Sequence, residues 1–182
     1  MSEPKQADVV KLVVSAFSAE SDILHKALET MTDQYGKMDF VGPLLPFNFT
    51  HYYADEMGLL LVRRFASFEK LICPEYLPEI KLVTNAVERQ NMINGRRRVN
   101  IDPGYVSQAH LILATGKGYT HRPYLNKGIY ADLTLVYQDK TFKPLPWTYP
   151  DYAEKECLDM FNKIRKRYLM QLKALKGFGK IV

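Results

Sequence analysis

The hydrophobic and polar positions along the chain follow first a strand-like and then a helical pattern. Residues 9–17 (VVKLVVSAF) form a nearly continuous apolar run, which is typical of a central strand that is buried on both faces. A helix follows, because apolar residues recur every fourth position from Ile23 to Tyr35, and Gly36 ends this pattern. The chain therefore begins with a β-α pair.

The next elements are set by further apolar runs and by Pro and Gly. The sequence predicts strands over 38–45 and 59–68. Pro74 and Pro78 then open a helix that Asn94-Gly95 ends, and a strand over 97–102 follows that Pro103-Gly104 stops. The order β-α-β-β-α-β is the ferredoxin-like one, with helices on one face of a mixed or antiparallel sheet. We thus expect an α+β core of this kind.

Beyond this core the pattern predicts additions. They are a short helix over 107–115, a strand over 128–138, a tight turn at Asp139-Lys140, an edge strand over 141–147 and a long helix over about 153–175. The expected fold is therefore a ferredoxin-like α+β core extended by a helix, a β-hairpin and a long C-terminal helix. We expect one domain over 1–182, with a flexible tail at 1–8.

Composition narrows the class of protein. The 182 residues are 47% hydrophobic and 25% charged, which are ordinary globular values. No apolar run approaches the roughly 18 residues that span a bilayer, the N-terminus is polar, and Cys73 and Cys157 are too few for a disulfide framework. We expect a cytoplasmic protein without a membrane partner.

The formal charge of +5 is distributed unevenly along the chain. Basic residues cluster at 63–64, at 96–98 and between Lys163 and Lys176. Such clusters suit partners that carry phosphate, whether small molecules or RNA. For the C-terminal cluster, a solvated helix surface is the simpler interpretation.

Most candidate chemistry lies between Arg96 and Tyr152. Asp102 is placed in an Asp-Pro-Gly turn, where it could act as a base or hold a divalent ion, although turns favour Asp for its own sake. His121 suits proton transfer and Arg122 suits bidentate phosphate binding. Asp132 lies on the polar face of the strand over 128–138. We therefore take Asp102, His121 and Asp132 as catalytic candidates.

Other side chains are candidates for holding a ligand. Arg64, Arg98 and Arg122 could bind phosphate, and Trp147, with Tyr149 and Tyr152, could stack on a base or sugar. Tyr130, a neighbour of Asp132 on the same strand face, is a further ligand-binding candidate. Several of these residues have simpler roles as alternatives. Arg63 and Arg64 point to opposite faces of a strand, so one of them faces inward. Trp147 could instead pack the edge strand against the last helix. Asp151 and Glu154 have the spacing of a capping box at the start of that helix.

Standard motifs for phosphate and metal are missing. Gly116-Lys117-Gly118 lacks the spacing of a phosphate-binding loop and is a weak anion-binding candidate through its backbone N–H groups. His51, Asp55 and Glu56 could contribute metal ligands, but their spacing matches no standard metal motif. The cofactor thus stays open, with a divalent ion at Asp102 and Asp132 as one option.

A resemblance covers nearly the whole chain. The stretches PFNFTHYYADEMG, RRVNIDPGY, LATGKGYTHRPYL, KGIYADLTLVY and WTYPDY resemble a bacterial and archaeal family known as a domain of unknown function (DUF4416), whose members are sometimes labelled GTP-binding proteins. At position 132, where this chain has Asp, the family pattern leads us to expect Glu, which has the same charge. The resemblance implies no assigned catalytic residue, and the chain has no Asn-Lys-x-Asp motif for guanine.

Two functions fit these observations. The first is binding of a phosphorylated small molecule or nucleotide, with action on the ligand left open. The second is a non-catalytic module that binds RNA or protein, because a ferredoxin-like sheet with exposed aromatics and a basic helix resembles an RNA-binding arrangement. The long C-terminal helix also offers a surface for a homodimer.

Overall fold

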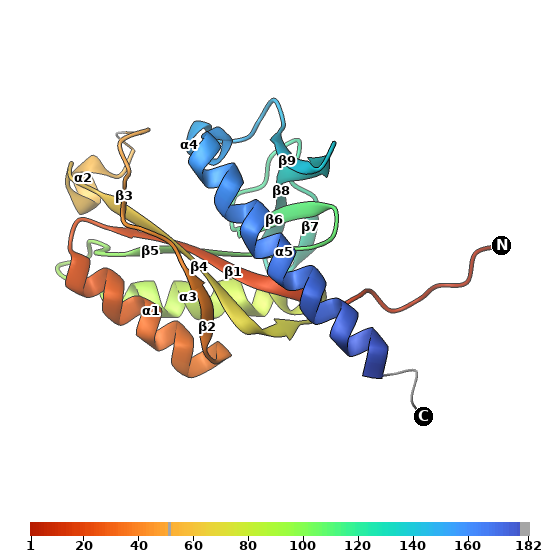
Figure 1. Cartoon of the computed structure of the whole chain (residues 1–182). Helices are drawn as coiled ribbons and strands as arrows, with labels where there is room; N and C mark the ends of the chain where they lie inside the picture. Colours follow the sequence, from red (N-terminus) through yellow and green to blue (C-terminus); the bar gives the residue numbers. More distant parts are fainter. Residues whose placement is uncertain (51, 179–182) are drawn as a thin grey trace.

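The computed structural model of the protein describes residues 1–50 and 52–178, and it is an α+β fold built on a large antiparallel sheet (Figure 1). The strands are β1 (Val10–Ser18), β2 (Met38–Val41), β3 (Leu45–Pro46), β4 (Val62–Ile72), β5 (Asn100–Val106), β6 (His110–Thr115), β7 (Tyr124–Asn126), β8 (Ile129–Gln138) and β9 (Thr141–Pro144). The helices are α1 (Ser21–Tyr35), α2 (Ala54–Met57), α3 (Leu77–Gln90), α4 (Pro150–Ala153) and α5 (Lys155–Phe178), with a 3₁₀ turn, η1, at Pro74–Tyr76.

The sheet has the strand order β2-β4-β1-β5-β6-β8-β7, and every pair in it is antiparallel. β3 extends the β2 edge along β4, and β9 pairs with β8 beside β7. β1 lies near the middle, and all nine of its residues are buried. The prediction of a central strand over 9–17 is therefore confirmed.

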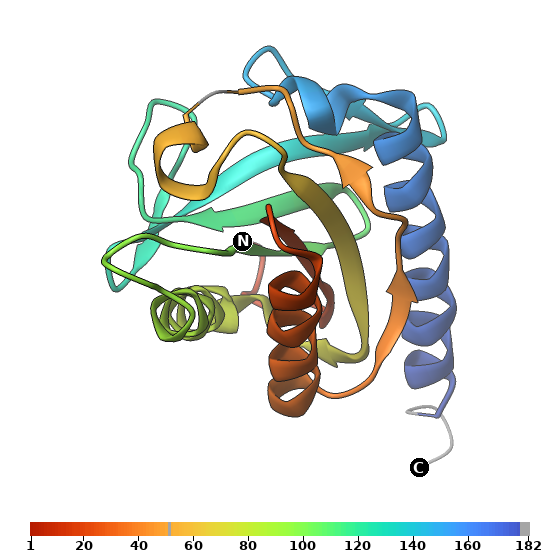
Figure 2. The ribbon, with the colours of Figure 1, turned by 90° about the vertical axis from the view of Figure 1, so that its left-hand side faces the viewer.

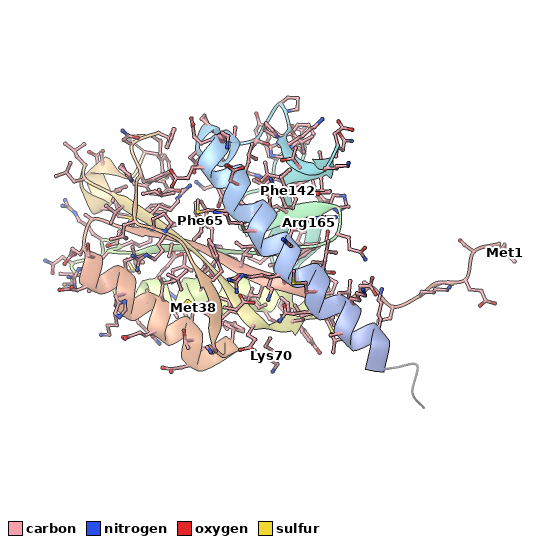
Figure 3. The ribbon with its side chains drawn as sticks, viewed as in Figure 1. Met1, Met38, Phe65, Lys70, Phe142 and Arg165 are labelled. Atoms are coloured by element: carbon pink, nitrogen blue, oxygen red, sulfur yellow. The ribbon has the colours of Figure 1, made fainter. Side chains whose placement is uncertain are left out.

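Helices cover both faces of the sheet (Figure 2). α1 and α3 pack on one face, where Leu24 and Ile80 join Leu12 and Phe68 in one core cluster. α4 and α5 pack on the other face. Figure 3 shows Phe65 and Phe142 near α5, and both belong to the second core cluster together with residues of that helix. Alternate residues of β1 and β4 thus enter two different cores.

The predicted helix over 107–115 is wrong, because this segment contains β6. Its residues pair with both β5 and β8, and Leu111 and Leu113 are buried. Residues 107–115 are too few for their local pattern to separate a helix from a strand. The segment forms a strand because it pairs with β5 along one edge and with β8 along the other, and these partners are distant in the sequence or join it only in the folded sheet.

The fourth strand also differs from the prediction, since β5 runs through Pro103-Gly104 instead of stopping there. Pro is tolerated in a strand where no partner needs its missing N–H, and pairing with β6 starts only at Gly104. A Cβ at Gly104 would lie 2.4 Å from the carbonyl oxygen of Ile112. Gly104 is therefore required by a close approach of two strands and not by a turn, and Asp102 lies inside a strand.

The hairpin after residue 128 is confirmed, with one correction to its faces. Asp139 and Lys140 both have positive φ and form the tight turn between β8 and β9. A register shift in the β6–β8 ladder pairs Asp132 with Leu113 but Leu135 with Leu111. Leu111, Leu113 and Leu135 share one core cluster, so Asp132 and Leu135 lie on one face, although simple alternation assigns them to opposite faces.

The sheet opens between β5 and β6, and this opening positions the candidate site. On its β6 side, β5 has no strand partner before Gly104. Side chains of α3 replace the missing strand: Glu88 accepts the Ile101 N–H at 2.8 Å, and Lys81 donates to the Ile101 carbonyl at 3.0 Å. A cleft therefore forms beside the unpaired part of β5.

Candidate functional site

A cleft of about 610 Å³ lies where β5 and β6 diverge. Its floor consists of α3 and the start of β5, and one wall consists of the end of β6, the loop after it and β8. The segment that joins β3 to α2 contributes Phe47, Phe49, Tyr52 and Tyr53, which we call the aromatic strap. Residues 149–152, which lead into and form most of α4, complete the lining. Residues from β1, β4, α3, β5, β6, β8 and α4 and from the loops between elements thus line one concave site.

The floor of the cleft holds Asp102 in a fixed orientation. Lys81 donates to Asp102 Oδ1 at 3.0 Å, and Asn100 donates to Oδ2 at 2.8 Å. The Lys81 side chain is only 8% exposed, whereas that of Asp102 is 33% exposed. The carboxylate is therefore oriented from below and open to the cleft.

Arg97 joins the floor to α2. It makes a two-pronged contact with Glu56, with Nε–Oε1 at 2.8 Å and Nη2–Oε2 at 2.7 Å. Its Nη1 donates to Asn100 Oδ1 at 3.0 Å and lies 3.4 Å from Glu88 Oε2. The hydrogen bonds with Glu56 raise the pKa of Arg97, and burial raises the pKa of Glu88.

The opposite wall carries a second polar cluster. Arg122 Nε donates to Asp132 Oδ2 at 2.7 Å, and Nη2 donates to the Tyr149 hydroxyl at 3.2 Å. His121 Nε2 lies 3.7 Å from the same Asp132 oxygen. The His121 ring stacks on Trp147 with centroids 5.0 Å apart, while Trp147 Nε1 donates to the Leu133 carbonyl at 2.9 Å. His121 and Trp147 thus support this wall from behind the residues that line the cleft.

Lys117 and exposed aromatic rings form the mouth. Lys117 Nζ donates to the Tyr52 hydroxyl at 3.2 Å and lies 4.5 Å from the centre of that ring. Tyr52 is 65% exposed, and Tyr149 is also exposed. Among the described residues, Lys117 has no carboxylate partner, unlike the other cations that line the cleft. Its charge is therefore available to an anion.

A third arginine is buried at the end of the cleft near α4. Arg63 pairs with Asp151, and its guanidinium lies 3.9 Å from the centre of the Phe47 ring. Tyr53 lies nearby, and burial followed by the charge of Asp102 raises its pKa to about 12. The Tyr53 hydroxyl therefore stays neutral across the physiological range.

The structure brings most of the predicted site residues together, but not all. Asp102, Arg122 and Asp132 line the cleft, and His121 and Trp147 lie directly behind its wall. Tyr130 also supports the wall, because a Cβ at Gly118 would lie 3.1 Å from its ring.

Arg64 and Arg98 lie elsewhere. Arg64 is on the α1 and α3 face of β4, since Arg63 takes the cleft face. Arg98 makes a two-pronged contact with Glu20 beside a separate shallow groove. Neither residue lines the cleft.

Several residues of the site were absent from the predicted set, among them Arg63, Lys81, Glu88, Arg97 and Asp151. The sequence pattern did indicate an inward-facing arginine at position 63 or 64, because adjacent residues of a strand point to opposite faces. The predicted capping role of Asp151 is wrong: no side chain caps α4, whose N-cap is Tyr149, and Asp151 is buried against Arg63. Lys81 and Glu88 look like ordinary polar positions of a helix in the sequence.

In the part of the chain that is described, the structure shows neither a cluster of potential metal ligands nor a membrane-spanning helix. No three His, Cys, Asp or Glu side chains of residues 1–50 and 52–178 are grouped so that they could hold a metal ion. His51, which was a candidate ligand with Asp55 and Glu56, lies outside the described residues. Within the same ranges, no helix is both long and apolar enough to cross a membrane.

Of three comparisons with known proteins, the one with family models gave a match. Neither the curated proteins nor the solved structures contain a significant match to this chain. A family model matches residues 8–168, which include every residue of the cleft. The chain belongs to the family described as Domain of unknown function (DUF4416).

Proposed function

We propose that the cleft binds a nucleotide or another phosphorylated small molecule. The observation that carries this proposal is Lys117, a cation without a carboxylate partner in the described chain, at the mouth of a cleft lined with aromatic rings. A volume of about 610 Å³ is within the range of roughly 300–1,000 Å³ that is usual for small-molecule sites. The cleft is therefore suited to a ligand of nucleotide size.

The lining supplies contacts for both ends of such a ligand. Lys117 provides a point charge for phosphate, and Arg122 lies beside it, since its Nη1 donates to the Lys117 carbonyl at 3.3 Å. The exposed rings of Tyr52 and Tyr149 offer flat surfaces on which a base can stack. The phosphate would thus lie beside Lys117, and a planar group would contact the exposed ring of Tyr52 or Tyr149.

Chemistry on the bound ligand would use the carboxylates and the imidazole. Asp102 and Asp132 are on opposite sides of the cleft, and His121 lies 3.7 Å from Asp132. A histidine beside a carboxylate is a common arrangement for proton transfer. Asp102 and Asp132, which line the cleft, are our candidates for contact with a reacting group, and His121 would act through Asp132.

A thermal-shift screen tests binding directly. Nucleotides and sugar phosphates should raise the melting temperature, since a ligand at one hundred times its Kd stabilises a protein by about 2.7 kcal/mol. Lys117→Ala should reduce the shift, whereas the matched change Lys26→Ala, at an exposed position of α1, should leave it unchanged. No shift with any phosphorylated compound would contradict the proposal.

A second candidate function, RNA binding, is favoured by one feature of α5. Residues 160–178 contain six Lys and Arg and no acid. However, Arg165 stacks on Tyr137, Arg167 donates to the Asp39 carbonyl, and Lys176 pairs with Asp8. Half of these cations are thus used within the protein. Salt-dependent retention of RNA by the purified protein would favour this function.

We infer further that the elements from β1 to β5 form a ferredoxin-like unit. The strand order β2-β4-β1-β5 with α1 and α3 on one face supports this interpretation.

For the compartment we propose the cytoplasm, because free thiols such as those of Cys73 and Cys157 persist in a reducing environment. Cell fractionation would test the compartment.

A further inference from the structure

We propose that Asp102 recognises a vicinal diol, so that the ligand of the cleft is a phosphorylated compound with a ribose-type sugar. This inference rests on the proposed function and names its ligand class. The observations that support it are the orientation of the Asp102 carboxylate, its access to the cleft, and its place in the cleft relative to Lys117.

Both oxygens of Asp102 are oriented by a neighbour but retain capacity to accept. Oδ1 accepts from Lys81 and Oδ2 accepts from Asn100. An ionised carboxylate has about four lone-pair sites, so each oxygen can accept one more hydrogen bond. Two adjacent hydroxyl groups match two adjacent acceptors, which is how an acidic residue binds the ribose of a dinucleotide in other folds.

The network beneath Asp102 prevents the carboxylate from turning away. Lys81 is tied to the Ile101 carbonyl, and Asn100 accepts from Arg97, which Glu56 holds in turn. A group that is ordered before the ligand arrives loses little entropy when it binds. Asp102 therefore has the properties of a prepared acceptor.

A purely structural role would not require Asp102 to be accessible. Lys81 and Glu88 serve such a role, and both are buried. The Asp102 side chain is 33% exposed and lines the cleft. A phosphate would be repelled by this carboxylate, whereas Lys117 attracts it. The geometry therefore separates a phosphate end at the mouth from a hydroxyl-bearing end at the floor.

The test compares ligands that differ by one hydroxyl. Wild-type protein is titrated with the four ribonucleoside monophosphates and ribose 5-phosphate, and with their 2-deoxy counterparts. Binding should weaken roughly 10- to 100-fold when the hydroxyl is removed, because a hydrogen bond to a charged group is lost. Asp102→Asn should remove this preference, and Asp139→Asn, at an exposed turn, should keep it.

Each result has a distinct meaning. Equal binding of ribose and deoxyribose compounds would overturn the diol inference and leave the proposed function standing. A ribose preference that survives in Asp102→Asn would overturn the assignment to Asp102. Failure of every phosphorylated compound to bind would overturn both proposals. The wild-type comparison does not depend on any variant, so the test holds even if Asp102→Asn fails to fold.

Discussion

The floor and the wall of the cleft have similar chemistry but are built in different ways. The wall cluster of Arg122, Asp132 and Tyr149 comes from 28 consecutive residues, from 122 to 149. The floor network joins residues that are distant in the sequence. They are Glu56 of α2, Lys81 and Glu88 of α3, Arg97 before β5, and Asp102 of β5. The wall is thus a local structure, and the floor exists only in the folded chain.

The floor and the wall contribute differently to stability and to recognition. Lys81 and Glu88 satisfy the backbone of Ile101 in place of a strand, so the floor holds the sheet together where it opens. The wall lies in and beside the loop after β6, and the hydrogen bonds of Arg122 to Asp132, Tyr149 and the Lys117 carbonyl do not replace a missing strand. We therefore expect changes in the floor to affect folding, and changes in the wall to affect mainly binding.

The largest effect is expected for Lys81→Met. The change removes one partner of Glu88, one of Asp102 and the side-chain donor to the Ile101 carbonyl, and removing one member of a buried ion pair costs about 3–5 kcal/mol. Chemical denaturation measures this loss. The matched control is Lys155→Met, whose exposed pair with Asp159 contributes about 0–1 kcal/mol. Equal losses in the two variants would refute the special role of the floor.

A smaller effect is expected at the point where the two regions separate. Gly104→Ala places a Cβ 2.4 Å from the Ile112 carbonyl oxygen, and we expect a loss of about 2–3 kcal/mol from such overpacking. Gly116→Ala is the control, because a Cβ there meets nothing within 4 Å. Thermal unfolding compares the stability of both variants with that of the wild type. A Gly104→Ala protein as stable as the wild type would show that β5 and β6 can move apart to accommodate a Cβ.

Arg122→Met should cost less than either change. It removes the hydrogen bonds to Asp132 and Tyr149, a loss of about 1.5–2 kcal/mol, and water in the cleft can replace part of them. Ligand-induced stabilisation should fall more than stability itself. A variant that unfolds like Lys81→Met would erase the distinction between wall and floor.

The smallest effect concerns the pH dependence of the floor. Burial raises the pKa of Glu88 in the folded state above its unfolded value. The stability linked to this group is therefore fully present below the unfolded pKa and declines as the pH rises through the folded pKa. Glu88→Gln should remove this decline, so the difference in unfolding free energy between the variant and the wild type should change with pH. A constant difference from pH 4 to pH 8 would contradict this prediction.

The candidate site was predictable to the extent that its residues are close in sequence. Asp132, His121, Arg122 and Trp147 stood out among turn residues and aromatics of one stretch, and the structure places them side by side. Asp102 was chosen for a turn that does not exist, yet it lines the cleft. The sequence predicts that the side chains of Arg63 and Arg64 lie on opposite faces of a strand, but it does not identify the face that carries the cleft. Of the two, the structure places Arg63, and not the predicted Arg64, in the lining of the cleft.

Elements with local signals could be predicted from residue types and their periods. They include the buried strand β1, the helix α1 with its regular spacing, and the turn at Asp139-Lys140. Three other features depend on contacts between distant segments: residues 110–115 form a strand, β5 passes through Pro103-Gly104, and Lys81 and Glu88 close an open sheet edge. The reason is physical: these outcomes depend on hydrogen bonds and close contacts between segments far apart in the chain, which no local pattern encodes.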